Sequence, residues 1–550
     1  MSSGPSKEQG LNGFDEGSFF AGEAEGSAGT VAVISVGAGL PGARLAVSDV
    51  SAAWDHPAVS GSLAVCSSDE DALTLAWSAG RNAIFSAGVE SCSIDGLWWG
   101  TSRPPMAEGP LHAFLAAALG LEGSVSGLLA GGSPHAGMDA LLAAWDAVAS
   151  GWSRRALVIA SDAVIPGPGT ALELSTGAGA VAYLLERHSR RSPAVLEARF
   201  TYGRPILDSY RGDGQHATSG PYDGRLFREE MLLALMAELG SAVGDKALRA
   251  TWSLPDPDGK LLHSVSKAFG AREVCSAGVH NQVGNTGTAA PFLGALSAMC
   301  EPGTVGMVAY GGGRATAVTM ELASAIPGGS QAMEVLRGGS SPPRRVSYTS
   351  TLRARGELAA FLEPIPMGVP PGSAAFARGN SEMLGLTGRR CHACGGVAVP
   401  PSIHPVCPFC GASGGSQIRL SLSGKVLTFV VNQTMPPPFE APLPIVVVDL
   451  DDGARAMFQG LPQDAPSYKV GDRVVLELRR YALERGIPVY GFKARRSSLV
   501  DEQPGSGPIE DLRLSSVDEP VSQAASQRVR DEGETSADSD ERLASQGRML

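Results

Sequence analysis

Four cysteines stand in two close pairs, Cys391-His-Ala-Cys394 and Cys407-Pro-Phe-Cys410, separated by twelve residues. Each pair places two thiolates on one tight turn, and two such turns can close a tetrahedral shell of four sulfurs around zinc. Glycines follow both pairs, where the chain must turn beneath the metal. Because four thiolates leave no open position, the pattern predicts a structural zinc site with the ligands Cys391, Cys394, Cys407 and Cys410. A pair of disulfides, or a ribbon without metal, is the alternative interpretation.

Length, net charge and the distribution of apolar residues limit the classes of protein to which the chain can belong. The chain has 550 residues, enough for two or three domains, and its net charge of -12 argues against nucleic acid as a main partner. Its first residues lack the basic start and apolar stretch of a signal peptide, and no apolar run reaches about 18 residues. We therefore expect a cytoplasmic protein without a membrane partner. The remaining cysteines are scattered, as reduced thiols would be: Cys66, Cys92, Cys275 and Cys300.

Changes in composition divide the chain into six predicted segments. Residues 1–29 are rich in Gly, Ser and Glu and are predicted to form a flexible leader, whereas residues 498–550 are polar and charged and are predicted to be a disordered tail. Pro- and Gly-rich stretches within 326–385 predict a connection. Between these segments we expect a body at 30–325, a zinc ribbon at 386–414 and a small barrel at 415–497.

The body alternates apolar runs typical of buried strands with segments of helical periodicity. Such alternation predicts a layered α/β fold with a mostly parallel sheet, and a second round of strands and helices, from about residue 195 to 325, indicates two similar halves. The predicted strands are Thr30–Val36, Ser93–Gly100, Ala156–Ser161 and Gly179–Leu185. The predicted helices are Ala72–Ala87, Gly137–Ser150, Arg228–Leu239 and Ala290–Met299.

The segment 415–497 has a different pattern, with short apolar strands separated by Pro, Gly and Asp turns. This pattern predicts a small closed barrel of the OB type, and an unclosed β-sandwich is the alternative. The predicted strands are Lys425–Val431, Ile445–Leu450, Arg473–Leu478 and Val489–Lys493.

The ribbon and barrel together resemble the zinc-ribbon plus OB-fold proteins that accompany thiolase-like enzymes. The resemblance implies a rubredoxin-like ribbon and a module that binds acyl-CoA or holds an acyl-transfer partner without being catalytic itself. It is carried by Arg390-Cys-His-Ala-Cys-Gly, Val406-Cys-Pro-Phe-Cys-Gly, Gly424-Lys-Val, Tyr468-Lys-Val-Gly-Asp and Tyr490-Gly-Phe.

The body resembles the thiolase superfamily, in particular its 3-hydroxy-3-methylglutaryl-CoA synthase branch. The resemblance implies an α/β/α/β/α layered fold of two similar halves, a coenzyme A thioester as substrate or ligand, and a homodimer. The matching elements, in chain order, are Ser68-Asp-Glu-Asp-Ala-Leu-Thr-Leu-Ala, Ala160-Ser-Asp-Ala, Pro168-Gly-Thr-Ala-Leu-Glu-Leu-Ser-Thr-Gly-Ala-Gly-Ala, Pro257-Asp-Gly-Lys260, Val283-Gly-Asn-Thr-Gly and Tyr310-Gly-Gly-Gly.

The residues at the catalytic positions depart from this family. Its nucleophilic Cys, at a helix start where the dipole lowers the thiol pKa, falls on Pro134, which cannot be a nucleophile. Ser133 and His135 flank that position, and a shift of one residue would make Ser133 a weak nucleophile; otherwise Ser133 caps the turn. The family's His falls on Pro255 and its general-acid/base Glu on Ser102. His263 and Glu108 lie too far along the chain to replace them.

Two binding positions are retained. Asn285, after Gly284, falls on the amide that positions the thioester oxygen in the family, although an Asn at such a turn is also a good helix cap. Lys260 falls on a residue that meets a CoA phosphate, although a solvated lysine is an equally good interpretation.

Three hypotheses follow. The first is an altered or inactive synthase that binds acyl-CoA or an acyl carrier as a scaffold for a partner such as a thiolase-type enzyme. The second is a retro-aldol lyase acting on β-hydroxyacyl-CoA, with Tyr202, Tyr210, Tyr222 or Tyr310 as its acid or base. The third is an active acyltransferase of the synthase or ketoacyl synthase type with a displaced nucleophile, drawn from the thiols outside the ribbon. The acyl chain and the pathway within lipid metabolism stay open.

Overall fold

The computed structural model describes part of the chain, and all described residues lie in one compact unit. The predicted leader and tail fall outside this part, apart from a short strand β1 (Phe20–Glu23) and Gly29. The predicted connection is described only at its two ends. The described residues are 20–23, 29–121, 125–339, 343–358, 382–435, 441–484 and 486–497.

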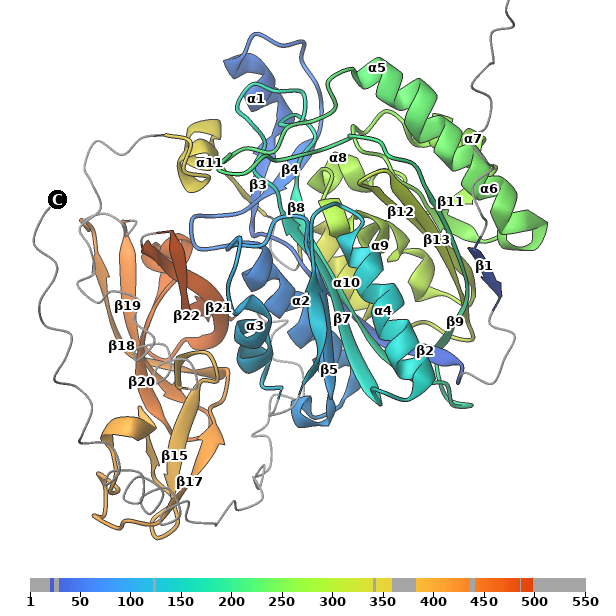
Figure 1. Ribbon diagram of the computed structural model, residues 1–550. Coiled ribbons are helices and arrows are strands. Elements are labelled where there is room, and N and C mark those ends of the chain that lie inside the picture. Colours follow the sequence, from blue (N-terminus) through green and yellow to red (C-terminus); the bar gives the residue numbers. More distant parts are fainter. Residues whose placement is uncertain are drawn as a thin grey trace, which may run out of the picture. The chain divides into compact units, whose positions relative to one another are not determined.

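One large mixed sheet forms the centre of the body, and it consists of two halves with the same pattern of strand directions (Figure 1). In the first half, three parallel strands, β6, β5 and β7, are followed by antiparallel β8 and β2. In the second half, parallel β11, β10 and β12 are followed by antiparallel β13 and β9. The two halves join where β2 pairs with β9. The two similar halves predicted from the sequence are confirmed.

The strands of the first half are β2 (Val31–Gly39), β5 (Gly96–Gly100), β6 (Ser126–Ala130), β7 (Arg155–Ala163) and β8 (Ala178–Arg187). Those of the second are β9 (Ala194–Gly203), β10 (Thr251–Ser253), β11 (Glu273–Val274), β12 (Gly303–Gly311) and β13 (Arg314–Leu322). A small separate sheet has the order β14 (Arg344–Arg345), β3 (Ala43–Ala46) and β4 (Ser62–Val65).

The prediction of a mostly parallel sheet is wrong. Among the described strands of this sheet, four pairings are parallel and six are antiparallel. The reason is that β7 and β8 follow one another without an intervening helix, as do β12 and β13. Such direct connections join antiparallel neighbours, whereas a parallel pair needs a crossover.

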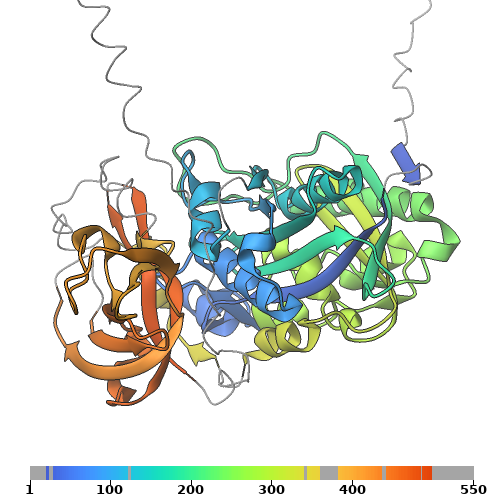
Figure 2. The same ribbon diagram turned by 90° about the horizontal axis from the view of Figure 1, so that it is seen from below.

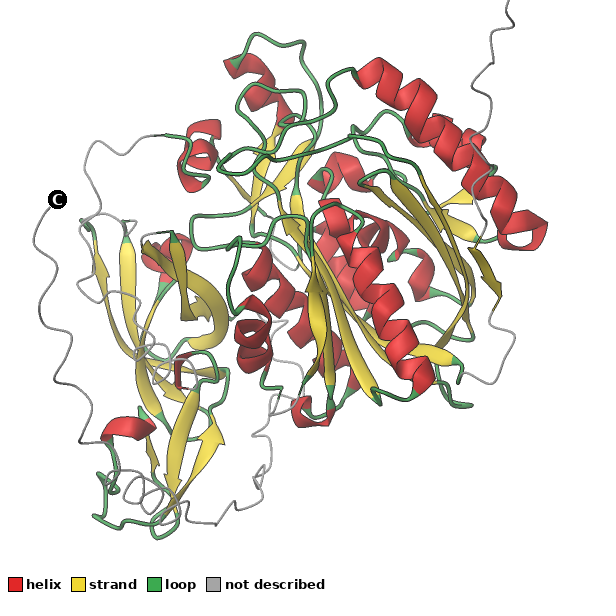
Figure 3. Ribbon diagram, in the orientation of Figure 1, coloured by secondary structure: helices red, strands yellow, loops and turns green. Residues whose placement is uncertain are grey.

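Helices cover both faces of the large sheet, as Figures 1 and 3 show. Along β7, Leu157 and Ile159 pack in one core with α2 (Ala72–Ala87), while Val158 and Ala160 pack in another core with α4 (Ala136–Ser150). Because successive side chains of a strand point to opposite faces, α2 and α4 lie on opposite sides of the sheet. The remaining α-helices of the body are α1 (Val47–Ala53), α3 (Leu111–Leu119), α5 (Gly224–Leu226), α6 (Leu233–Ala247), α7 (Leu262–Phe269), α8 (Val279–Val283), α9 (Ala290–Ala295), α10 (Gly329–Arg337) and α11 (Tyr348–Ala354).

Some predicted elements differ at their ends. The helix predicted at Arg228–Leu239 begins with a π-helical turn, Phe227–Leu232, before α6. The helix predicted at Ala290–Met299 is two pieces, α9 and a 3-10 turn at Ala298–Cys300. No helix within the described ranges is both long enough and apolar enough to span a bilayer.

The C-terminal domain is a five-stranded, nearly closed barrel, so the OB-type prediction is confirmed. Its strands pair in the order β20-β19-β18-β21-β22. Ala494 of β22 closes the ring, because it forms a bridge with Gly460 and its carbonyl accepts a hydrogen bond of 3.2 Å from the Leu461 N–H. Figure 2 shows the curved strands from below. They are β18 (Ser423–Asn432), β19 (Leu443–Leu450), β20 (Arg455–Gln459), β21 (Arg473–Glu484) and β22 (Ile487–Arg496), of which the sequence did not predict β20.

The barrel is bonded to the body at the start of α2. Lys493 on β22 donates to Asp69 at 3.0 Å, and the Tyr490 hydroxyl donates to Asp71 at 2.8 Å. Asp71 is also the N-cap of α2, where its side chain accepts from the Leu73 and Thr74 N–H groups. The barrel therefore bonds directly to the residue that begins a core helix of the body.

A chain of ion pairs extends from this contact. Arg479 on β21 bridges Glu70 of the body and Glu477 of the barrel, and Arg495 donates to Glu477 at 2.5 Å. Burial raises the pKa of Glu477, but the charges of Arg495 and Arg479 outweigh it and lower the pKa to about 2. The carboxylate is thus held in its charged form by its two arginine neighbours.

This pKa predicts an acid-dependent contribution to stability. Because the folded pKa lies below the ordinary value of 4.5, the contribution is present above about pH 4.5 and is lost as the pH falls towards about 2. Glu477→Gln should lower the free energy of unfolding at neutral pH, and the gap to the parent chain should shrink by about 3 kcal/mol on acidification. Urea unfolding at several pH values measures this. Glu197→Gln, at an exposed residue of β9, is the control, and its free energy of unfolding should depend on pH as that of the parent does. The same pH dependence in Glu477→Gln would contradict the prediction.

Candidate functional site

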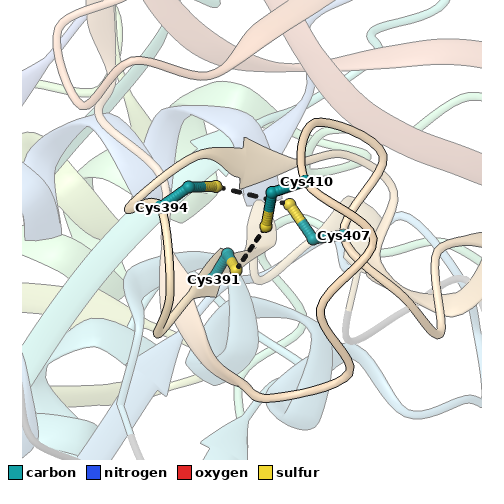
Figure 4. Close-up of side chains that lie close together, drawn as sticks. All are labelled: Cys391, Cys394, Cys407 and Cys410. Atoms are coloured by element: carbon teal, nitrogen blue, oxygen red, sulfur yellow. Dashed lines mark hydrogen bonds between the residues drawn. The ribbon is translucent and has the colours of Figure 1, made fainter.

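The four cysteines of the ribbon converge on one point (Figure 4). Their sulfurs all lie within 4.8 Å of one another, with Cys391 and Cys410 separated by 3.7 Å and Cys394 and Cys407 by 3.6 Å. Zinc–sulfur bonds of about 2.3 Å place the sulfurs of a tetrahedron about 3.8 Å apart. A disulfide requires about 2.05 Å. The cluster therefore has the dimensions of a metal site and not of two disulfides.

Both cysteine pairs form the same kind of turn. They belong to a ribbon of three strands in the order β16 (Val397–Ala398), β15 (Thr387–Cys391) and β17 (Gly415–Arg419). Gly395 donates its N–H to the Cys391 carbonyl, and Gly411 donates to the Cys407 carbonyl, each at 2.9 Å. Both glycines have a positive φ, near 75°. In the first turn, N–H groups of Cys394 and Ala393 lower the pKa of Cys391 to about 6. Backbone donors directed at sulfur suit a bound thiolate.

The body's candidate site begins where α4 starts. Pro134 lies in the turn before this helix, and the Ser133 carbonyl accepts from the Ala136 N–H at 3.0 Å. The Ser133 hydroxyl accepts from the His135 N–H at 3.2 Å, so it acts as a turn residue. The hairpin between β12 and β13 packs tightly against this turn, since a Cβ on Gly312 would lie 2.9 Å from the Ser133 Cβ.

His135 is 1% exposed and belongs to a buried polar network. Its Nε2 lies 2.8 Å from the Thr316 hydroxyl, and its Nδ1 lies 3.1 Å from Asp139. Burial raises the pKa of Asp139, but the hydrogen bond and charge of His135, together with Arg314, bring it below its ordinary value. Both ring nitrogens of His135 therefore have protein partners, and the ring is enclosed beneath the helix start.

Asn285 also uses its side chain within the protein. Its Nδ2 donates to the Pro257 carbonyl at 3.4 Å, and its Oδ1 accepts from the Gly287 N–H at 3.0 Å. It thereby ties the loop that contains Pro255 to the turn before α9. Gly284 precedes it with φ 79°, and a Cβ there would lie 2.8 Å from a Leu63 methyl.

The other predicted positions are more open. Lys260 is exposed, and its N–H donates to the Asp258 carboxylate at 2.9 Å. His263 is exposed on α7, and Glu108 is exposed in the loop before α3, so neither joins the site. The structure does bring together the segments around Pro134, Ser102 and Asn285. A Cβ on Gly137, at the start of α4, would lie 2.8 Å from the carbonyl oxygen of Thr288, which follows Asn285. Thr288 in turn donates its N–H to Asp162, which also accepts from Ser102.

Asp162, at the end of β7, joins these segments and was assigned no role from the sequence. It is fully buried and accepts from the Ser102 hydroxyl at 2.8 Å, the Thr101 hydroxyl at 3.0 Å and the Thr288 N–H at 2.8 Å. Burial raises the pKa of Asp162, and these donors offset only part of that effect. Ser102, expected from the sequence at the family's Glu position, is thus a donor to a buried carboxyl group. The only signal in the sequence was the matching element Ala160-Ser-Asp-Ala.

Comparisons with known proteins find relatives of both the body and the barrel. Curated relatives of the body are the hydroxymethylglutaryl-CoA synthases of Pyrococcus furiosus and Thermococcus gammatolerans, each 28% identical over 298 residues, 52% of this chain and 83% of the relative. That of Methanopyrus kandleri is 27% identical over 303 residues, covering 52% and 85%. Residues 417–479 match the family model "ChsH2, C-terminal OB-fold domain". The chain therefore combines a body similar to hydroxymethylglutaryl-CoA synthases with a C-terminal OB-fold domain.

Solved structures show the same fold for the synthase-like body. The structure of MvaS in complex with 3-hydroxy-3-methylglutaryl coenzyme A matches with a TM-score of 0.51 at 18% identity. A hydroxymethylglutaryl-CoA synthase complexed with CoA matches with a TM-score of 0.50 at 18% identity. Each alignment covers 62% of this chain and 95% of the other. The thiolase-like fold expected for the body is therefore confirmed.

Three thiols of the synthase-like body lie in surroundings that disfavour the thiolate form. Burial raises the pKa of Cys66, with Glu70 adding to the effect, and burial raises the pKa of Cys275 to about 12. Burial also raises the pKa of Cys300. Cys92 is exposed on a 3-10 turn. A catalytic thiol needs a lowered pKa, so Cys66, Cys275 and Cys300 have the opposite environment.

One of the candidate tyrosines lies close to the site. The Tyr310 hydroxyl is buried beside the Asp208 carboxyl group, and burial together with Asp208 raises the pKa of Tyr310. Asp208 accepts from the Gly312 N–H at 2.9 Å, on the hairpin that packs against Ser133, and burial raises its pKa. Tyr210 and Tyr222 are exposed on the loop between β9 and α5.

The cysteine cluster predicts that metal and folding are linked. Cys394→Ser leaves three thiolates, so the purified protein should lose most of its bound zinc, and the ribbon should unfold at lower denaturant than in the parent. Metal analysis under reducing conditions and urea unfolding followed by proteolysis measure both effects. Cys92→Ser is the matched control and should keep the parent's metal content. A Cys394→Ser protein of unchanged stability would mean that the metal does not support the fold.

Proposed function

We propose that this chain is an acyl-CoA-handling protein of the hydroxymethylglutaryl-CoA synthase type that binds CoA thioesters without forming an acyl-cysteine. It serves as a scaffold or as an altered synthase. The substrate class rests on the homologous synthases, whose name specifies a CoA thioester. The altered chemistry rests on the residues at the start of α4.

The single observation that carries this proposal is the sequence Ser133-Pro134-His135 at that helix start. The positive end of the helix dipole remains, but no thiol stands there to be activated by it. The Ser133 hydroxyl is used in the turn, and His135 is buried among Thr316 and Asp139. A serine without a base within reach is a weak nucleophile.

The third hypothesis, an acyltransferase with a displaced nucleophile, has less support. Cys66, Cys275 and Cys300 all have raised pKa values, which disfavour the thiolate. Thioester binding does not need a thiol, because backbone N–H groups at a helix start can hold an oxygen or a phosphate. Lys260, exposed near the Asn285 turn, is available for a CoA phosphate.

Other parts of the proposal concern zinc and partners. The four ribbon thiolates would hold a structural zinc, since they leave no position for substrate. Partners would be acyl-CoA or an acyl carrier, with a thiolase-type enzyme as a further possibility. A homodimer is supported by β6, which ends the order of described strands in the large sheet and exposes 41% of Leu128. An unpaired edge strand with an exposed apolar side chain is a site for pairing with a second copy.

A second candidate function, a retro-aldol lyase acting on β-hydroxyacyl-CoA, is favoured by Tyr310 and Asp208. In such a reaction, a base takes the proton of the β-hydroxyl group, the bond between the α and β carbons breaks to release an aldehyde or ketone, and the thioester enolate gains a proton. Asp208, with its raised pKa, suits the base, and the buried hydroxyl of Tyr310 beside it suits a donor to the enolate.

The first test is the intact mass of the protein after incubation with acetyl-CoA and acetoacetyl-CoA. We expect no adduct on the parent chain, together with CoA thioester binding by calorimetry. Pro134→Cys places a thiol at the helix start and should acquire an acetyl group if the position is correct. An adduct on a defined Cys or Ser of the parent would restore the acyl-enzyme mechanism, and an absence of any CoA thioester binding would remove the proposal.

The lyase reaction has its own test. Release of an aldehyde or ketone from a β-hydroxyacyl-CoA should fall by at least about 100-fold in Tyr310→Phe if this tyrosine is the acid. Tyr222→Phe is the matched control, because Tyr222 is fully exposed, and it should keep the parent rate. If the parent chain releases no carbonyl product, the lyase function is excluded for that substrate.

A further inference from the structure

The second cysteine turn of the ribbon has little backbone support from the rest of the fold. The first pair follows β15, whose backbone pairs with β16 on one side and with β17 on the other. The second pair lies in the stretch 404–413, which contains no helix or strand. Within the described part of the chain, the backbone hydrogen bonds of this stretch all stay within 401–412. Apart from a bound metal, side chains must therefore fix the second turn where the four sulfurs meet (Figure 4).

The Arg389 side chain supplies such a contact. Its Nη1 donates to the His404 carbonyl at 3.1 Å and to the Pro405 carbonyl at 2.5 Å, and its Nη2 donates to the Ser413 carbonyl. The three carbonyls lie before and after the second pair, so one guanidinium holds both ends of its turn. Because alternate residues of a strand point to the same face, Arg389 and Cys391 project from the same face of β15. The strand that carries the first turn thus also holds the second.

The charge of Arg389 is not neutralised by a carboxylate. Its acceptors within the described residues are backbone carbonyls, and the ribbon segment 386–414 contains no Asp or Glu. Four thiolates around a divalent cation leave a net negative charge. The unpaired charge of Arg389 therefore complements a metal-bound cluster better than it complements two uncharged disulfides.

The neighbouring Arg390 allows position to be separated from charge. It carries the same charge, pairs with Val397 of β16 through its backbone, and points to the other face of β15. Among the described residues, no hydrogen bond joins its side chain to the stretch 404–413, and its buried Nε has no partner. Two arginines of one strand thus differ in whether they hold the second turn.

We propose that Arg389 is a positioning residue of the metal site, whose guanidinium holds the Cys407–Cys410 turn in place so that the four thiolates are arranged before the metal binds. The inference rests on the zinc site of the proposed function and is independent of its acyl-CoA part. Side chains that orient metal ligands without touching the metal change metal affinity by about 10- to 100-fold.

The test measures the zinc affinity of the full chain under reducing conditions, by competition with a chelator. Arg389→Gln should weaken zinc binding by at least about tenfold, because the carbonyls at both ends of the second turn lose their donor. Arg389→Lys keeps the charge but lacks the planar fork, so it should restore only part of the affinity. Arg390→Gln removes the same charge from the same strand, and as the matched control it should bind zinc within about twofold of the parent.

The order in which the cysteines become reactive tests position against general stability. With limiting zinc, alkylation mapped by tandem mass spectrometry should label Cys407 and Cys410 of Arg389→Gln faster than in the parent, and before any change at Cys391 and Cys394. Val397→Ala is the reference, because it removes part of a buried side chain of β16 and should raise the labelling of all four cysteines together.

The outcomes separate this inference from the zinc site itself. The inference is overturned, and the zinc site stands, if Arg389→Gln binds zinc as the parent does or if its four cysteines are labelled together. Full rescue by Arg389→Lys, or an equal loss of affinity in Arg390→Gln, would assign the effect to charge alone and would also overturn it. If the parent binds no zinc, the zinc site and this inference both fail, while CoA thioester binding is decided separately by calorimetry.

Discussion

The arrangement of the candidate site depends on one buried carboxyl group. Asp162 is removed from water at the end of β7, and a carboxylate in such a place is tolerated only when donors surround it. Its donors come from the loop after β5 and from the turn before α9, two segments far apart in the sequence. Moving either segment would take donors away from a buried acceptor. The loop with Ser102 and Arg103 is therefore held in place by the need to satisfy Asp162.

The same requirement holds for the other polar residues of the candidate site. His135 and Asn285 each find protein partners for both ends of their polar groups. Pro134 lies in the turn that these bonds frame. A position held by its neighbours can exchange the residue that does chemistry while the loops around it stay in place. A fold that keeps its backbone donors can keep a ligand even where the covalent chemistry has changed.

The sequence predicted those features whose cause lies within a few residues. The ends of α2 were correct because Asp71 and Thr74 form a capping box and Gly88 ends the helix with a positive φ. The cysteine cluster was predicted because both members of each pair lie on one turn. The direction of the strands was not predicted correctly. The sequence pattern between β7 and β8 did not show whether a short helix or a direct connection joins them. Asp162 was missed for a different reason: its significance comes from burial beside remote segments, and a single sequence carries no record of it.

The bond between Tyr490 and Asp71 joins two domains that also belong to one chain, and this determines how their contact responds to dilution. In separate proteins, a contact of a few charged and aromatic groups would be governed by concentration and would dissociate on dilution. Within one chain, the barrel samples only the volume that its tether allows, equivalent to a local concentration in the millimolar range for a short tether. A weak contact is then enough to keep the two domains together. Their ratio is fixed at one to one by synthesis, so neither can be produced in excess of the other.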